Sequence, residues 1–290
     1  MTQLANQLFN GLITGSFYAL LSLGLAVIFG VLRVVNFAHG AFYMLGAFGG
    51  YLLLLQFKIG FWPALLLSPL LIGALGVVLE RVLIRRLYTV DPLYNFLLTF
   101  AVSLVATDTM RLRYGVQGLP YAPPRQLQGI MPLGPIFTTK YRLFALVFAI
   151  AVCLLVWFLI ERTRVGMVVR AATEKPALTR ALGVDVDRWI PPVFGFGVAL
   201  AALGGVLAAP IYNVSPLMGA DVIVVIFAIV VIGGLGSILG AVVAGLGIGL
   251  VGALARALGY PQLEYVLIFV VMAIVLLVRP AGLFGSAEAG

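Results

Sequence analysis

The stretch VVNFAHGAF (residues 34–42) holds the two polar side chains best placed for chemistry in an apolar environment. Asn36 and His39, the only histidine, lie between two long apolar runs, and Gly40 follows them. A histidine there could carry a proton or contact a polar substrate. Both side chains could instead bond to backbone groups that are freed where a helix breaks or re-enters. Asn36 and His39 are therefore candidates for a translocation path, with a structural role at a helix break as the alternative.

Other reactive groups are scarce. One histidine and one cysteine, Cys153, cannot supply the ligands of a zinc site or form an internal disulfide. None of the three lysines follows a glycine, so the GxxxxGK[ST] motif of a phosphate-binding loop is absent. Asp108, Asp221 and Glu264 lie at the ends of apolar runs, which argues against ion coupling through a central carboxylate. We expect no metal, no cofactor and no catalytic residue in this chain, and any ATP with Mg²⁺ to bind to another subunit.

Charge is concentrated in residues 161–188, which hold ten of the 28 charged residues. In this segment Thr173 can cap a helix, Glu174 suits a first turn because of the helix dipole, and Pro176 is tolerated there. Gly183 fits the position just past a helix C-terminus. The sequence therefore predicts a helix over EKPALTRAL, residues 174–182.

The predicted helix is too short to be stable alone, so its apolar face needs a surface to pack on. That face consists of Ala177, Leu178, Ala181 and Leu182, with Arg170, Glu174 and Arg180 at its rim. We expect it to enter a groove on a separate cytoplasmic protein. The alternative is a helix that packs on its own bundle or lies on lipid headgroups.

The rest of the chain must position Asn36, His39 and the predicted loop helix relative to a membrane. The mean hydropathy is +1.16, and 10% of residues are charged, whereas about 25% is usual in soluble domains. The charge-free apolar runs suited to a membrane are residues 1–32, 34–57, 59–79, 92–107, 143–160, 189–220, 222–255 and 265–278. The first is expected to be a membrane helix rather than a signal peptide. The seventh has room for two elements, because GGLGSILG interrupts it. The prediction is one all-α polytopic membrane domain, residues 1–290, with eight or nine transmembrane helices and a short cytoplasmic helix.

Lys and Arg residues in alternate loops predict the orientation. Residues 80–91 and 161–188 are basic and two spans apart, so both are placed in the cytoplasm. Residues 111–141 then face outside, where prolines and glycines predict an ordered cap. The N-terminus is expected outside and the C-terminal VRPAGLFG inside. The net charge of +8 suits membrane lipid, and no nucleic-acid partner is expected.

Glycines four residues apart indicate close helix packing, since small residues let backbones approach in a membrane. The pairs are Gly11 and Gly15, Gly46 and Gly50, Gly236 and Gly240, and Gly245 and Gly249. We expect packing within the bundle, with contact to a partner helix as the alternative.

The segment GMVVRAATEKPALTRALGVDVDRW resembles the cytoplasmic loop of ABC-importer permeases. The matching positions are Gly166, Arg170-Ala171-Ala172, Pro176, Ala177, Ala181 and Leu182-Gly183-Val184. Among these permeases the chain is most similar to the branched-chain amino acid family, and to the shorter of its two permease types. The motifs GLITGSFYALLSLGLAVIFGVLRVVNFAHGAFYMLGAF, VVIGGLGSILGAVVAG and RPAGLFG extend the resemblance over most of the chain.

The resemblance implies one subunit of a five-part importer in the bacterial cytoplasmic (inner) membrane. Its partners would be a second homologous permease, two ATP-binding cassette subunits, and a periplasmic or lipid-anchored binding protein that delivers leucine, isoleucine or valine. The loop helix would be the coupling helix, with Arg170, Glu174, Pro176, Ala177, Leu178, Arg180, Ala181, Leu182 and Gly183 as the ATPase-coupling residues. The alternatives are a permease for urea, short amides or other amino acids, an ion-coupled secondary transporter, and a channel or scaffold.

Overall fold

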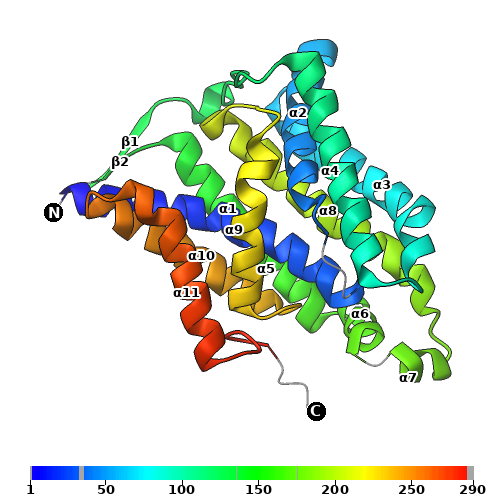
Figure 1. Ribbon diagram of the computed structural model, residues 1–290. Coiled ribbons are helices and arrows are strands. Elements are labelled where there is room, and N and C mark those ends of the chain that lie inside the picture. Colours follow the sequence, from blue (N-terminus) through cyan, green and yellow to red (C-terminus); the bar gives the residue numbers. More distant parts are fainter. Residues whose placement is uncertain (1, 33–35, 135, 175, 286–290) are drawn as a thin grey trace.

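The computed structural model describes residues 2–32, 36–134, 136–174 and 176–285, and most of them are helical (Figure 1). The α-helices are α1 (Thr2–Leu32), α2 (His39–Phe57), α3 (Phe61–Val82), α4 (Pro92–Tyr114), α5 (Lys140–Arg162), α6 (Arg164–Glu174), α7 (Pro176–Ala181), α8 (Val186–Tyr212), α9 (Met218–Gly233), α10 (Ile238–Ala257) and α11 (Glu264–Val278). The short elements are the 3-10 helices η1 (Ile84–Leu87), η2 (Arg125–Leu127) and η3 (Pro261–Leu263), and the strands β1 (Ile130–Leu133) and β2 (Ile136–Thr139).

Within the described residues, eight helices are long and apolar enough to cross a membrane. They are α1, α2, α3 with η1, α4, α5, α8, α10, and η3 with α11. α9 is apolar but has only 16 residues. The seventh apolar run holds α9 and α10, and the chain turns between them at Gly234–Ser237, inside the predicted interruption. The predicted all-α membrane fold of eight or nine helices is confirmed.

Side-chain caps explain where several of these helices begin. The Asp91 carboxylate accepts a hydrogen bond from the N–H of Leu93 at 2.8 Å, and Pro92 occupies the first position of α4. The Ser237 hydroxyl accepts from the N–H of Gly240 at 3.1 Å and caps α10. Such caps satisfy N–H groups that the first turn leaves without a helical partner.

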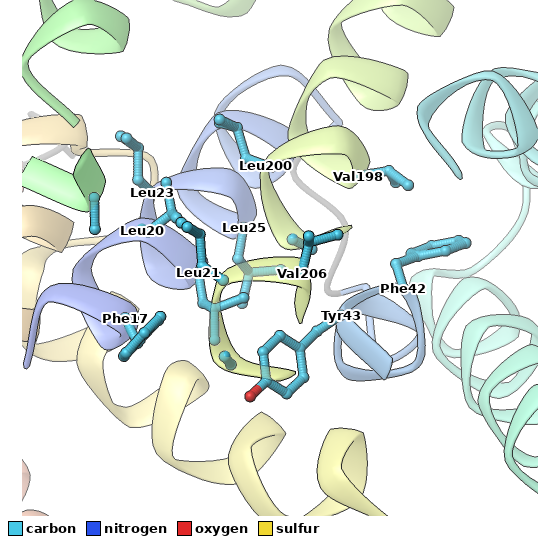
Figure 2. Close-up of a cluster of buried hydrophobic side chains, with 14 of the residues drawn as sticks. Phe17, Leu20, Leu21, Leu23, Leu25, Phe42, Tyr43, Val198, Leu200 and Val206 are labelled. Atoms are coloured by element: carbon cyan, nitrogen blue, oxygen red, sulfur yellow. The ribbon is translucent and has the colours of Figure 1, made fainter. Parts of the chain in front are cut away.

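α1 and α8 form the centre of the bundle. In their most apolar stretch of 18 residues, 78% of α1 and 72% of α8 are buried, against 11% of α4 and 6% of η3–α11. α1 packs against α8 and α10, while α8 also packs against α2 and α3. Figure 2 shows the apolar side chains that meet there: Phe17, Leu20, Leu21, Leu23 and Leu25 of α1, Phe42 and Tyr43 of α2, and Val198, Leu200 and Val206 of α8. α4 and α11 lie at the periphery.

Glycine lets the central backbones approach each other. A Cβ on Gly24 of α1 would lie 2.7 Å from the Gly197 carbonyl oxygen of α8, and a Cβ on Gly197 would lie 2.7 Å from the Gly24 oxygen. No side chain fits such a contact without moving a backbone. The predicted glycine pairs also lie at contacts within the chain: Gly11 and Gly15 against α10, Gly46 and Gly50 against α8, Gly245 and Gly249 against α1, and Gly236 and Gly240 at the α9–α10 turn. Packing within the bundle is therefore confirmed.

The segment between α4 and α5 forms a cap on one end of the bundle. β1 and β2 are antiparallel, with Ile130 paired to Thr139 and Leu133 paired to Ile136. The N–H of Phe137 donates to Asn6 Oδ1 at 3.0 Å, which holds the hairpin on the start of α1. A β-bridge joins Leu119 to Val214, between α8 and α9. The cap and the N-terminus therefore share one end of the bundle, and α6 and α7 lie at the other (Figure 1).

The loop between α5 and α8 differs from the prediction of one helix, because it contains α6 and α7. Thr173 and Glu174 lie at the end of α6, so the predicted cap and first turn are wrong at these positions. α6 begins earlier because the Thr163 hydroxyl accepts from the N–H of Gly166 at 3.3 Å. Residue 175 lies outside the described residues. Pro176 cannot extend α6, since it has no N–H, and it begins α7 as its first-turn placement predicted.

Gly24→Leu should destabilise the folded protein, because the new side chain would meet the Gly197 carbonyl, the His39 ring and Leu200. Overpacking of this kind costs about 1–3 kcal/mol. Thermal unfolding in detergent, followed by size-exclusion chromatography, should show a lower midpoint. Gly247→Leu is the matched control, since a Cβ on Gly247 of α10 meets nothing within 4 Å. Equal midpoints for the two variants would contradict close packing of α1 against α8.

Candidate functional site

His39 is fully buried at the first position of α2. Its Nε2 lies 2.9 Å from the carbonyl oxygen of Leu21 in α1. Because a carbonyl oxygen only accepts, Nε2 carries the proton and donates this hydrogen bond. The ring's other nitrogen, Nδ1, is then an acceptor, and it has no partner among the described residues. His39 thus fixes α2 to α1 and retains one unused polar atom.

Asn36 is also buried, with 1% of its surface exposed. Its Oδ1 accepts from the N–H of Ala38 at 3.1 Å, which satisfies a backbone group just before α2. This is the bonding to freed backbone that the structural alternative predicts. Its Nδ2 has no partner among the described residues. Asn36 and Thr99 line a small cavity of about 10 Å³ whose other walls, from α2, α3, η1, α4 and α8, are apolar. A role on a translocation path stays a prediction for Asn36 and His39.

The segment before α2 is held between peripheral and central helices. The N–H of Phe37 donates to Thr99 Oγ1 of α4 at 3.2 Å. The Phe37 ring stacks on Phe227 of α9, with ring centroids 4.6 Å apart. The backbone of Gly40 lies against that of Gly219, so α2 and α9 begin side by side within the bundle. Any movement of α4 or α9 would therefore act on Asn36 and its cavity.

The predicted coupling segment is tied to its own chain by polar contacts. Arg170 forms an ion pair with Glu161, at the end of α5. Thr179, which is buried, donates from Oγ1 to the Ala171 carbonyl of α6 at 2.8 Å. Arg180 pairs with Asp187 of α8 at 2.9 Å. These contacts fix α7 to α6 and α8, so the two arginines expected at the rim are paired within the chain in this structure.

α7 and the residue after it nevertheless present apolar side chains to their surroundings. Leu178 is 56% exposed and Leu182 is 78% exposed, and Ala181 is also exposed. Gly183 has a φ of +85°, the left-handed conformation that its predicted place after the helix requires. The N–H of Val184 donates across it to the Thr179 carbonyl at 3.2 Å and closes the helix end. The side chains of Glu174, Pro176 and Ala177 lie outside the described part of the structure. The coupling role of these residues stays a prediction.

Glu80 is a buried carboxylate that sequence reasoning missed, because it ends an apolar run. In the structure it is fully buried within the span Phe61–Leu87. Its Oε1 accepts from the Tyr88 hydroxyl at 2.5 Å, and its Oε2 has no partner among the described residues. Burial raises the pKa of Tyr88, and the hydrogen bond to Glu80 raises it further, so the phenol stays a donor. Spacing on one helix could not have found this pair, because eight residues of continuous helix would hold the two side chains about 12 Å apart. They meet because α3 ends at Val82 and the 3-10 helix η1 follows.

A second carboxylate, Glu264, also has a partner that the sequence did not indicate. It forms an ion pair with Arg256, which joins α11 to the end of α10. Both side chains are largely buried. In the described part of the chain, no three His, Cys, Asp or Glu side chains are grouped so that they could hold a metal ion.

Tyr88→Phe should lower the midpoint of thermal unfolding, because it leaves both oxygens of buried Glu80 without a donor. The loss of one partner of a buried polar group costs about 1–3 kcal/mol. Tyr94→Phe is the matched control, since Tyr94 is 54% exposed on α4. The account of Glu80 is wrong if the two variants unfold at the same temperature.

The chain is similar to known permeases over nearly its whole length. The family model described as "Branched-chain amino acid transport system / permease component" matches residues 7–276. The high-affinity branched-chain amino acid transport system permease protein LivH of Escherichia coli (strain K12) is 30% identical over 301 residues, which cover 97% of this chain and 96% of LivH. The corresponding BraD protein of Pseudomonas aeruginosa is 30% identical over 294 residues, with 97% and 96% covered.

A more distant relative comes from Methanocaldococcus jannaschii. It is named a probable branched-chain amino acid transport permease protein LivH, and it is 28% identical over 298 residues, which cover 94% of this chain and 90% of the relative. No solved structure matches the chain. The similarity therefore extends from α1 to α11 and includes both the segment before α2 and the loop with α6 and α7.

Proposed function

The chain belongs to the family of permease components of branched-chain amino acid transport systems, and we propose that it is the permease subunit of an ATP-driven importer for leucine, isoleucine and valine. It is a transporter subunit and a multi-pass protein of the bacterial cytoplasmic membrane. The observation that carries the substrate proposal is the similarity over 97% of the chain to permeases named for these amino acids.

The source of energy is proposed to lie on partner subunits. The sequence has no phosphate-binding loop, so ATP with Mg²⁺ would bind to two ATP-binding cassette subunits and no cofactor would bind to this chain. A second, homologous permease would complete the membrane part. A periplasmic or lipid-anchored binding protein would deliver the substrate to the end of the bundle that carries the β1–β2 cap.

The coupling element is proposed to be α7. Its exposed Leu178 and Ala181, and Leu182 directly after it, would enter a groove on an ATP-binding subunit, because exposed apolar side chains away from lipid are stabilised by a partner. The contacts of Thr179 with Ala171 and of Arg180 with Asp187 would make α6, α7 and the start of α8 move together. Closure of the ATP-binding subunits would then shift α8.

The candidate path residues suit an amino acid as the transported molecule. The unpaired Asn36 Nδ2 is a donor for a carboxylate, and the unpaired His39 Nδ1 is an acceptor for an ammonium group. Both lie near the start of α2, where the helix dipole also favours a carboxylate. When α8 moves, the cavity beside Asn36 would open and expose Asn36 Nδ2 to the substrate.

An ion-coupled transporter is the second candidate, and the buried Glu80 favours it, since intramembrane carboxylates often carry coupling ions. Glu80 lies close to η1 at the end of its span, where its hydrogen bond with Tyr88 suits a structural role better.

Reconstitution of the complete complex in proteoliposomes tests the proposed function. Labelled leucine should enter only with ATP inside, and uptake should fall to background when the catalytic glutamates of the ATP-binding subunits are replaced by glutamine. Labelled urea should not be transported. Leucine uptake by this chain alone under a proton or sodium gradient would contradict the proposal. Urea uptake without leucine uptake would mean that urea, and not leucine, is the substrate.

A further inference from the structure

A polar cavity of about 720 Å³ lies at the end of the bundle that carries α6 and α7. Its lining residues are Arg81, Arg85, Asp185, Asp187, Arg188 and Pro191. Arg81 belongs to the last turn of α3 and Arg85 to η1, whereas the others lie at the start of α8. The cavity thus lies between the end of one membrane span and the beginning of another.

The acidic side chains of the cavity are already paired. Asp185 pairs with Arg188 at 2.8 Å, and Asp187 pairs with Arg180 at 2.9 Å. In the part of the chain that the structure describes, the Arg81 and Arg85 side chains have no ion pair and no hydrogen bond. Two exposed guanidinium groups of the described residues therefore line the cavity without an ion-pair or hydrogen-bond partner, and both can bind an anion.

The charges around the cavity leave one positive charge in excess. The three arginines that line the cavity, at positions 81, 85 and 188, stand against two carboxylates, Asp185 and Asp187. A phosphodiester carries one negative charge, and the guanidinium fork binds phosphate oxygens in pairs. The cavity is therefore complementary in charge and in chemistry to one phosphodiester.

The surface beside the cavity indicates which kind of phosphate-containing molecule could bind there. Exposed apolar side chains run along one face of α3 at spacings of four, three and four residues: Leu71, Leu75, Val78 and Val82, which are 59%, 42%, 56% and 48% exposed. This stripe ends at Val82, next to Arg81. An inorganic phosphate ion has no apolar part that could cover this stripe, whereas the acyl chains of a phospholipid could pack on it.

We propose that the cavity binds the phosphate of an anionic phospholipid between Arg81 and Arg85, with the acyl chains of the lipid along α3. The inference goes beyond the proposed function and does not depend on the transported substrate. A lipid held there would connect η1 to the start of α8, next to the segment that carries α7.

Native mass spectrometry of the purified transporter complex tests the proposal. With phosphatidylglycerol and phosphatidylethanolamine in equal amounts, the wild type should retain phosphatidylglycerol in preference. The double variant Arg81→Gln/Arg85→Gln should bind phosphatidylglycerol about tenfold more weakly or worse, since two charge-assisted hydrogen-bonding groups are lost. The control is Arg86→Gln/Arg113→Gln, which removes the same charge from residues that do not line the cavity. Equal loss in both variants, or equal retention of the two lipids, would overturn the proposal.

Three further measurements distinguish the other possible occupants of the cavity and keep the proposal testable if the double variant folds poorly. Inorganic phosphate should not displace the lipid, and displacement at matched concentration would assign the cavity to a free anion instead. If the double variant binds lipid as the wild type does but loses the ATP-binding subunits, Arg81 and Arg85 contact those subunits and not a lipid. In the unaltered complex, raised NaCl should release phosphatidylglycerol, because exposed charges are screened. Salt-independent binding would contradict the arginine site.

Discussion

Helices in hydrocarbon have no hydrophobic drive to associate, so close packing and satisfied polar groups must hold them together. The contact on which this bundle depends is the approach of α1 to α8, where Gly24 and Gly197 each face the other's carbonyl oxygen. The hydrogen bond from His39 to the Leu21 carbonyl adds α2 to the same centre. Because every larger side chain would force these backbones apart, the three helices behave as one unit.

This rigid centre connects the loop at one end of the bundle to the segment before α2. α7 contacts α6 and α8, and α8 packs along α2 and α3. A displacement of α7 would therefore reach Asn36 and its cavity through α8, without any need for flexible connections inside the membrane. The peripheral α4 touches the same segment through Thr99 and Phe37. In the proposed importer, the connection from α7 through α8 would transmit the energy supplied by ATP. The contact between α4 and the segment before α2 would open or close the path.

Much of this architecture can be read from the sequence, because membrane spans and glycine spacing are local signals. The eight spans, the turn between α9 and α10, and the left-handed Gly183 are examples. The partners of Asn36, His39 and Glu80 cannot be read in this way, since they depend on which helices meet. The sequence did not show α6 either. Thr163 and Thr173 can both cap a helix, and the local sequence does not indicate which of the two precedes a helix start. Exposure of Leu178 and Leu182 agrees with the predicted apolar face, whereas Arg170 and Arg180 already pair within the chain.

The central claim, that α7 docks on an ATP-binding subunit, is tested most directly by site-specific photo-crosslinking. Leu178→Cys in a Cys153→Ser background gives a single exposed thiol, since Cys153 is the only native cysteine and is buried. A benzophenone attached at position 178 in the assembled complex should crosslink to the ATP-binding subunit, with a yield that changes on ATP addition. The same probe at Leu112→Cys, a position that is 89% exposed at the end of α4, should not. Efficient labelling at position 178 without any crosslink to that subunit would contradict the account.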